Sequence, residues 1–328
     1  MTSRQSPLKA AMGELFSSYG VASGLLGSTW WQSAVALSTV ETYAQTTGDT
    51  SFDAAITQAY ALNSRGKFEN SSDDDTAWWG LAWLQAYDMT RNRSYLSMAE
   101  TDADYIHQDW DSACGGGVWW QRDPRSYKNA ISNELFLELT AWLHNTIPGD
   151  TKYLAWAQAE WSWFDNSGMI NSGNLINDGL SNDCTNNGQP TWTYNQGVIL
   201  AGLAQLYKAT GNRALLTEAE TLATAAISHL AAGGVLTEPC KTDACADKFG
   251  ASAQSFKGIF VTDLKVLAVT AHTSQFNAFF RAQAQSIETR DTTSQHQLGV
   301  YWAGPIAGVT PSSQASALDA LVAAVNLP

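Results

Sequence analysis

The chain repeats one pattern, in which an apolar helix is followed by a polar turn and a second helix. Six apolar helical segments recur at intervals of 45 to 66 residues, near 31 to 47, 76 to 90, 128 to 145, 194 to 210, 256 to 272 and 313 to 326. Several of them end in similar turns that stop a helix: Thr47-Gly48-Asp49-Thr50, Thr90-Arg91-Asn92-Arg93, Pro148-Gly149-Asp150-Thr151 and Thr210-Gly211-Asn212-Arg213. A unit recurring at this spacing indicates an array of helical hairpins.

The two helices of a hairpin differ in their apolar pattern. In 212 to 231, apolar residues from Leu215 to Leu230 keep to one face, whereas 194 to 210 is apolar nearly all round. This alternation predicts an inner and an outer ring of helices, closed into an all-α toroid of six hairpins within one domain, 1 to 328. Residues 7 to 20 should supply the outer partner of the last helix. The β-like stretches 116 to 121, 169 to 175 and 234 to 238 should decorate one rim.

Adjacent carboxylates stand just before a tryptophan pair, in Asp73-Asp74-Asp75-Thr76-Ala77-Trp78-Trp79. Neighbouring Asp side chains can hold their carboxyl groups roughly 5 Å apart, the separation that a retaining glycosidase uses. Like charges this close cannot both ionise easily, so one acid keeps its proton beside an ionised nucleophile. The alternative is that Asp75 caps the helix while the other two are solvated or dipole-stabilising acids.

Tryptophan is unusually frequent, with 14 copies in 328 residues, and many copies stand among polar residues. Sugars have apolar ring faces edged with hydroxyl groups, so a sugar site needs flat aromatic rings beside amide and charged groups. The polar first turns of the inner helices should point to the same rim as the Asp pair. We therefore expect a set of polar and aromatic residues to bind substrate: Trp119, Trp120, Gln121, Lys128, Asn129, Trp192, Tyr194, Asn195, Gln196, Tyr301 and Trp302.

Structural roles compete with binding at some of these positions. Capping and loop anchoring are the alternative for Lys128, Asn195 and Gln196. The helical pair Trp78 and Trp79 is assigned to packing and to support of the site. Asp178 is expected to shape a turn rather than to contact sugar.

The charge balance excludes several function classes. The formal net charge is −13, and only 18 Lys and Arg are spread along the chain without clusters. Binding to nucleic acid or to an anionic membrane is therefore excluded, and the substrate should be neutral or cationic. No apolar run approaches the roughly 20 residues of a membrane span, and residues 1 to 10 lack the apolar segment of a signal peptide.

Four cysteines lie in loop-like sequence. An even count in loops indicates two disulfides in a secreted protein whose signal peptide has been removed. The expected pairs are Cys240 with Cys245 and Cys114 with Cys184, because these loops are too rich in Gly and Asn to be held by packing. A zinc site is the rival interpretation, but the spacing and the absence of paired His make a poor ligand set. Asn70 and Asn92 begin potential glycosylation sequons, which agrees with secretion.

Five segments together resemble glycoside hydrolase family 76, and they run in order from about residue 30 to 305: Asp74-Asp75-Thr76-Ala77-Trp78-Trp79-Gly80-Leu81, Cys114-Gly115-Gly116-Gly117-Val118-Trp119-Trp120, Lys128-Asn129-Ala130-Ile131-Ser132-Asn133, Trp192-Thr193-Tyr194-Asn195-Gln196-Gly197 and Phe256-Lys257-Gly258-Ile259-Phe260. The family contains endo-α-1,6-mannanases with an (α/α)6 barrel. The resemblance implies a retaining mechanism with Asp74 as nucleophile and Asp75 as acid/base, and it adds Lys257 to the expected substrate-binding residues. Asp73 is an extra acid ahead of the pair. We expect it either to help position the site or to lie in the solvated segment that leads into the helix.

The leading functional hypothesis is a secreted, monomeric endo-α-1,6-mannanase of fungal type that cleaves mannan and requires neither metal nor cofactor. A cell-wall mannan transglycosylase would use the same Asp pair, with a sugar hydroxyl replacing water. A non-catalytic mannan-binding protein would need the aromatic rings but not two adjacent acids.

Overall fold

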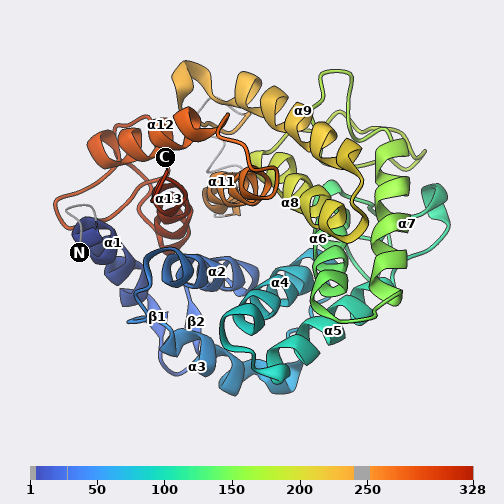
Figure 1. Cartoon of the computed structure of the whole chain (residues 1–328), viewed down its shortest axis with the longest axis horizontal. Helices are drawn as coiled ribbons and strands as arrows, with labels where there is room; N and C mark the ends of the chain where they lie inside the picture. The colour runs from blue at the N-terminus through green and yellow to red at the C-terminus, as the bar shows by residue number, and fades with distance from the viewer. Residues whose placement is uncertain (1–4, 28, 240–251, 328) are drawn as a thin grey trace.

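The inner helices form a closed ring. The structure is a computed structural model that describes residues 5–27, 29–239 and 252–327. Each inner helix packs against the next, and the last packs against the first (Figure 1). In chain order the six are α2 (Trp30–Thr47), α4 (Asp73–Thr90), α6 (Ala130–Thr146), α8 (Thr193–Thr210), α11 (Ala253–Thr270) and α13 (Pro311–Ala323). The predicted toroid is therefore confirmed.

The outer helices cover this ring (Figure 1). They are α1 (Gln5–Ser17), α3 (Ala54–Asn63), α5 (Arg93–His107), α7 (Lys152–Asn166), α9 (Arg213–Leu230) and α12 (Asn277–Arg290), with short 3-10 turns η1 (Ser64–Gly66), η2 (Ala113–Gly115) and η3 (Ala232–Gly234). Helices α5, α7 and α9 each pack on the inner helix before them, and α1 packs on α13 as predicted. The burial of α9 along one face and of α8 nearly all round also matches the prediction.

The predicted turns end the inner helices. Gly48 and Gly211 have φ values of 75° and 72°, and each donates its N–H to the carbonyl four residues earlier. Arg91 takes the same left-handed conformation at φ 58°. The next residue in two of these turns, Asn92 or Asn212, then caps the following helix through its side chain. The chain can therefore reverse within one or two residues, which produces the hairpins.

The strands expected at 116 to 121, 169 to 175 and 234 to 238 were predicted wrongly. Within the described residues the only sheet is the short antiparallel pair β1 (Tyr19–Gly20) and β2 (Leu25–Leu26). Gly117 and Gly234 both have a φ of 83°, which interrupts an extended backbone. These loops make only isolated bridges, such as that between Ser72 and Gln121.

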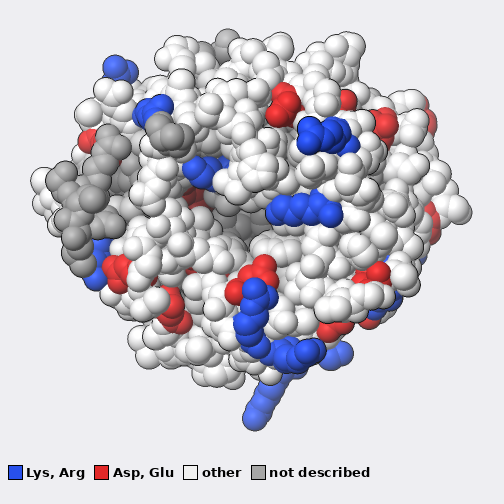
Figure 2. Space-filling view, in the orientation of Figure 1, with Lys and Arg blue, Asp and Glu red and all other residues white. Residues whose placement is uncertain are grey.

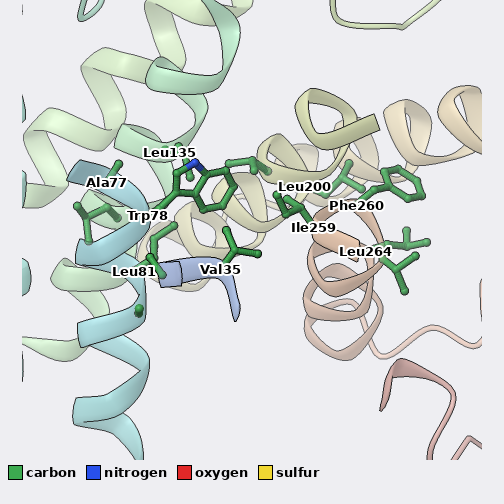
Figure 3. Close-up of a cluster of buried hydrophobic side chains, with 14 of the residues drawn as sticks. Val35, Ala77, Trp78, Leu81, Leu135, Leu200, Ile259, Phe260 and Leu264 are labelled. Carbon is green, nitrogen blue, oxygen red and sulfur yellow. The ribbon is translucent and has the colours of Figure 1, made fainter. Parts of the chain in front are cut away.

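Apolar side chains from several inner helices meet inside the ring. Figure 3 shows Val35 of α2, Trp78 of α4 and Ile259 of α11 lying close to one another, and all three are buried. Across residues 5–27, 29–239 and 252–327, no helix combines the length and apolar character that a membrane span requires.

Glycines allow neighbouring inner helices to approach closely. A Cβ at Gly197 of α8 would lie 2.5 Å from Cα of Phe260 on α11. A Cβ at Gly258 of α11 would lie 2.5 Å from Cα of Ser316 on α13. Since both contacts are with backbone atoms, a side-chain rotation cannot relieve them. Residues larger than Gly at these positions would push the ring open.

We expect Gly197→Ala to lower the free energy of unfolding by about 1–3 kcal/mol, because the methyl group overpacks the α8–α11 contact. Gly13→Ala is the matched control: nothing lies within 4 Å of a Cβ there, and Gly13 is inside a helix. That control should be neutral or stabilising by about 0.4–1 kcal/mol. Urea unfolding of both variants measures the difference, and equal stabilities would contradict the close-packing argument.

Candidate active site

The three consecutive acids occupy the first turn of α4. Ser72 is the N-cap and the helix begins at Asp73, three residues before the predicted start. Asp75 is therefore not the N-cap. The helix start is fixed by the neighbouring loop, because the Asp73 N–H donates to the Trp120 carbonyl at 2.9 Å and the Arg122 N–H donates to the Ser71 carbonyl at 3.0 Å.

Asp74 and Asp75 line a cavity of about 300 Å³. The other lining residues come mainly from the first turns of the inner helices and the loops before them: Trp31, Ser72, Trp78, Trp120, Tyr127, Asn129, Asp178, Tyr194, Ser252 and Phe256. The structure thus brings together segments separated by more than 200 residues of sequence.

Three predicted binding residues line this cavity. Asn129 caps α6 by accepting the N–H of Ser132. The ring of Tyr194 stacks on Phe256 with 3.8 Å between ring centroids. The third residue, Trp120, is held by its backbone, which donates to the Tyr127 carbonyl at 2.8 Å.

Lys128 and Gln196 anchor loops instead of lining the cavity. The buried ammonium group of Lys128 donates to Asp111 Oδ1 at 3.0 Å and to three loop carbonyls, those of residues 113, 116 and 117. The Gln196 amide exchanges two hydrogen bonds of 2.8 Å with the backbone of Ile176. These contacts agree with the anchoring alternative, and a role of either residue in binding substrate stays a prediction.

The remaining predicted binding residues lie outside the cavity lining that the described residues form: Trp119, Gln121, Trp192, Asn195, Lys257, Tyr301 and Trp302. Trp119 donates through Nε1 to Asp111 at 2.7 Å. Lys257 is buried, donates to the Val300 carbonyl and lies 4.6 Å from the centre of the Trp302 ring. Contact of these residues with a longer substrate stays a prediction.

Asp178 and several aromatic residues belong to the cavity although the sequence did not mark them as binding residues. Asp178 was assigned to a turn, but its carboxyl lines the cavity and accepts the hydroxyl of Tyr127 at 2.5 Å. Trp78 was assigned to packing and also reaches the cavity. Phe256 is part of the segment 256 to 260 that resembles the glycoside hydrolase family, and this resemblance was the signal that could have marked it as a cavity residue.

Burial outweighs the helix dipole in setting the protonation of the Asp pair. The N-terminus of a helix favours a carboxylate by about 0.3–1 kcal/mol, less than one pKa unit, whereas full burial raises a carboxyl pKa by up to 3–5 units. Burial, and then the charge of Asp75, raises the pKa of Asp74. Burial likewise raises the pKa of Asp75. The pair therefore retains a proton near neutral pH, as acid/base catalysis at this site would require.

Asp73 is not solvated, which corrects one of the two roles assigned to it. Its side chain is fully buried beside Asp109, and Asp109 holds the Arg122 guanidinium at 2.7 Å, closer than the 3.4 Å between Arg122 and Asp73. Burial and the charge of Asp109 raise the pKa of Asp73 to about 9, and the Arg122 charge offsets only part of this. The raised pKa favours the neutral form of Asp73 at neutral pH.

A disulfide ties together two loops that form the cavity walls. Cys114 and Cys184 are bonded with 5.2 Å between their Cα atoms, as predicted. The bond joins the loop before Trp120 to the loop after Asp178. Cys240 and Cys245 lie outside the described residues.

Comparisons with known proteins agree on one family. The family model described as Glycosyl hydrolase family 76 matches residues 8–327. The chain is 30% identical to the mannan endo-1,6-alpha-mannosidase DFG5 of Candida albicans, over 51% of this chain and 40% of that protein. It is also 30% identical to the mannan endo-1,6-alpha-mannosidase DCW1 of Saccharomyces cerevisiae, over 60% of this chain and 46% of that protein. The match thus spans about half the length of these relatives.

A solved structure has the same fold. It is an inactive variant, with two consecutive aspartates replaced, of the alpha-1,6-mannanase GH76A of Salegentibacter sp. HEL1_6 in complex with alpha-1,6-mannotetrose. The two chains superpose with a TM-score of 0.86 over 100% of each, at 23% identity.

We expect Asp73→Asn to flatten the pH dependence of stability. With its folded pKa near 9 and an unfolded pKa of about 3.9, Asp73 contributes stability that is complete below about pH 4 and is lost as the pH rises towards 9. The variant should therefore lose less unfolding free energy than the wild type between about pH 5 and about pH 8.

The matched control for this experiment is Asp183→Asn. A hydrogen bond from Ser181 lowers the pKa of the exposed Asp183, so its contribution changes only at more acidic pH. Urea unfolding at several pH values measures both slopes. An unchanged slope in Asp73→Asn would show that Asp73 is ionised in the folded protein.

Proposed function

Because the chain belongs to glycosyl hydrolase family 76, we propose that it is a secreted retaining endo-α-1,6-mannanase that cleaves mannan through a covalent mannosyl-enzyme. The observation that carries this proposal is the placement of two adjacent carboxyl groups, Asp74 and Asp75, in a cavity walled by aromatic rings. Such a cavity offers both the acid pair and the flat faces that a pyranose needs.

The backbone favours Asp74 as the nucleophile. Its Oδ1 accepts the N–H of Asp75 at 3.0 Å, and a hydrogen bond to a carboxylate stabilises the ionised form. This contact also orients the carboxylate, and a hydrogen bond from the Trp120 side chain further favours its ionised form. Burial raises the pKa of Asp74 to about 8 and that of Asp75 to about 6, so the assignment of the retained proton to Asp75 rests on these hydrogen bonds and not on burial.

In the first step, Asp74 attacks the anomeric carbon while Asp75 gives its proton to the glycosidic oxygen, so the bond to the leaving sugar breaks as the mannosyl ester forms. In the second step, Asp75 accepts a proton from water, whose oxygen displaces Asp74 from the anomeric carbon. Two inversions give net retention. The reaction ends with Asp74 ionised and Asp75 protonated, as it began.

The walls of the cavity suit a neutral sugar. Trp31, Trp78, Trp120, Tyr194 and Phe256 supply aromatic surface. No Lys or Arg is present in the lining formed by the described residues. Hydrogen bonds to hydroxyl groups would come from other lining residues, such as Asn129 and Asp178.

Two further observations support this proposal. The Salegentibacter mannanase is inactive when two consecutive aspartates are replaced, and Asp74 and Asp75 are consecutive. Secretion is supported by the Cys114–Cys184 disulfide, because such bonds persist in oxidising compartments.

The proposed function is tested by digestion of linear α-1,6-mannan, with products sized and their anomeric configuration followed by NMR. Early internal fragments with α configuration are expected. Release of single mannose units only would contradict endo action, and β products would contradict retention. Products longer than a defined starting oligosaccharide would show that a sugar hydroxyl replaces water, as in a transglycosylase.

We expect Asp74→Asn to abolish turnover on every substrate, because no carboxylate remains to form the ester. Asp75→Asn should lose about 10²–10⁴-fold in rate on mannan but keep the first step on an aryl mannoside, whose leaving group departs without a proton. Azide should rescue its second step. Release of the phenol leaving group in a single turnover measures the first step separately from the second.

Asp73→Asn is the control within the same turn, and it should retain most activity because Asp73 is outside the cavity lining. If Asp73→Asn is as inactive as Asp74→Asn while Asp75→Asn stays active, the catalytic pair is shifted by one residue.

A further inference from the structure

A short loop, residues 120 to 127, carries cavity-lining residues at both of its ends. Trp120 and Tyr127 line the cavity of the Asp pair, whereas none of the residues between them does. The Trp120 N–H donates to the Tyr127 carbonyl at 2.8 Å, which closes the loop at its base. Whatever holds this loop against the helices therefore decides where both cavity side chains lie.

Ion pairs hold the loop 120–127. On the face that Figure 2 shows, basic and acidic side chains are interspersed around the central hollow and form no large patch of one sign. Around the loop, in contrast, opposite charges are paired at short distance. Five ion pairs join two arginines of the loop and the lysine after it to acids of α4 and of the segment after α5: Arg122 with Asp73 and Asp109, Arg125 with Asp109 and Asp111, and Lys128 with Asp111.

Asp109 is at the centre of these contacts. Its side chain is 1% exposed, and its two oxygens lie 2.5 Å and 2.7 Å from guanidinium nitrogens of Arg125 and Arg122. A hydrogen bond also joins the carboxyl groups of Asp109 and Asp73. Loss of one partner from a buried ion pair is strongly destabilising, unlike loss of a pair at the surface. Asp109 is therefore the acid on which the position of the loop depends most.

The Arg122 end of the loop is also tied to two helices. Its backbone meets the N-cap of α4, because Ser72 forms a bridge with Gln121. The Arg122 guanidinium donates to the Tyr105 carbonyl of α5 at 3.0 Å and lies 3.7 Å from the centre of the Tyr105 ring. The orientation of Trp120 relative to α4 thus depends on where Arg122 is held.

Trp120 contacts the proposed nucleophile. Its side chain makes a hydrogen bond to Asp74. The indole ring has one N–H and no acceptor, so it can only donate, and such a bond stabilises the ionised carboxylate. The titratable groups that face Asp74 are Asp73 and Asp75 of α4 and Tyr194 of α8. A displaced indole would leave the carboxylate without one of its donors.

We propose that Asp109 is a positioning residue of the active site: by holding Arg122 and Arg125 it keeps the loop 120–127 against α4, and so keeps the Trp120 indole N–H on Asp74. The proposal deepens the proposed function and rests on it where the reaction is concerned. It agrees with the mild effect expected of Asp73→Asn, because that variant keeps a donor to Asp109. Asp109→Asn instead removes the charge that both guanidinium groups share.

The first test follows the indole contact by NMR and needs no substrate. With tryptophan labelled with nitrogen-15, the Trp120 indole signal is identified by its loss in Trp120→Phe. In the wild type this signal should shift with pH as Asp74 ionises, and Asp74→Asn should remove the shift. Asp109→Asn should lose most of it. A full wild-type shift in Asp109→Asn would overturn the proposal, whether or not the chain cleaves mannan.

Asp150→Asn is the matched control. The side chain of Asp150 is 6% exposed and pairs with His144 at 3.0 Å, and it lies beyond the C-terminal end of α6, whereas Asn129 caps the end of α6 at the cavity. This variant should also lose stability but should keep the pH shift of Trp120. Equal losses of the shift in the two variants would indicate general loosening and refute a specific role for Asp109.

Arg125→Gln decides the question if Asp109→Asn does not fold. Arg125 is half-exposed, and its replacement leaves the ion pair between Arg122 and Asp109 in place. It should lose part of the same indole shift. A complete shift in this variant would contradict the proposal.

The second test measures the reaction on α-1,6-mannan. Asp109→Asn should lower kcat/KM at least about tenfold, the size expected for loss of a hydrogen bond to a charged group. The pH at which kcat/KM falls on the acidic side should move upward, as in Trp120→Phe, because Asp74 loses a donor to its ionised form. The double variant should be no worse than the more damaging single variant, since both act through one contact.

Additive effects in the double variant, with an active wild type, would show that Asp109 does not act through Trp120. A wild type that does not cleave mannan would contradict the proposed function instead, and the NMR test of Asp109 would still stand.

Discussion

Closure of the inner ring is the constraint on which the rest of the structure depends. Helix α13 packs against both α11 and α2, so the last inner helix completes a circle begun about 280 residues earlier. Close contacts at Gly197 and Gly258 keep neighbouring helices near enough for this closure. Because each hairpin returns the chain to the same end, the first turns of the inner helices meet at one rim, and Asp74 there faces Tyr194 and Phe256 across a single cavity.

The same closure explains why the pKa values of so many acids inside the ring are raised. An acid on an inner helix has other helices on all sides, and burial is the largest cause of the raised pKa at Glu41, Glu134, Asp263 and Asp319 alike. Burial therefore favours the uncharged form of these carboxyl groups. The effect of burial on the catalytic pair is one instance of this general property.

The sequence predicted the ring because a helix that is apolar all round has few alternatives to full enclosure, and because glycine or asparagine turns stop helices in a recognisable way. It also marked Asp74 and Asp75, whose adjacency is itself the chemical signal. It could not tell which polar residues of the first turns face the cavity. Lys128 and Asn129 are neighbours of similar polarity, yet one anchors a loop and the other lines the cavity. Asp178 lies on a loop whose path depends on distant contacts, including that with Tyr127.

Access to a cavity, rather than protonation, distinguishes the catalytic acids from the others. Asp73 and Asp74 are neighbours in one helical turn, and burial raises the pKa of both. Asp73 points towards Asp109 and Arg122 and is sealed from solvent, so its proton has no substrate to reach. Asp74 faces the opening between aromatic rings. Successive side chains of a helix are separated by about 100°, so burial raises the pKa of both neighbours although only Asp74 of the two lines the cavity.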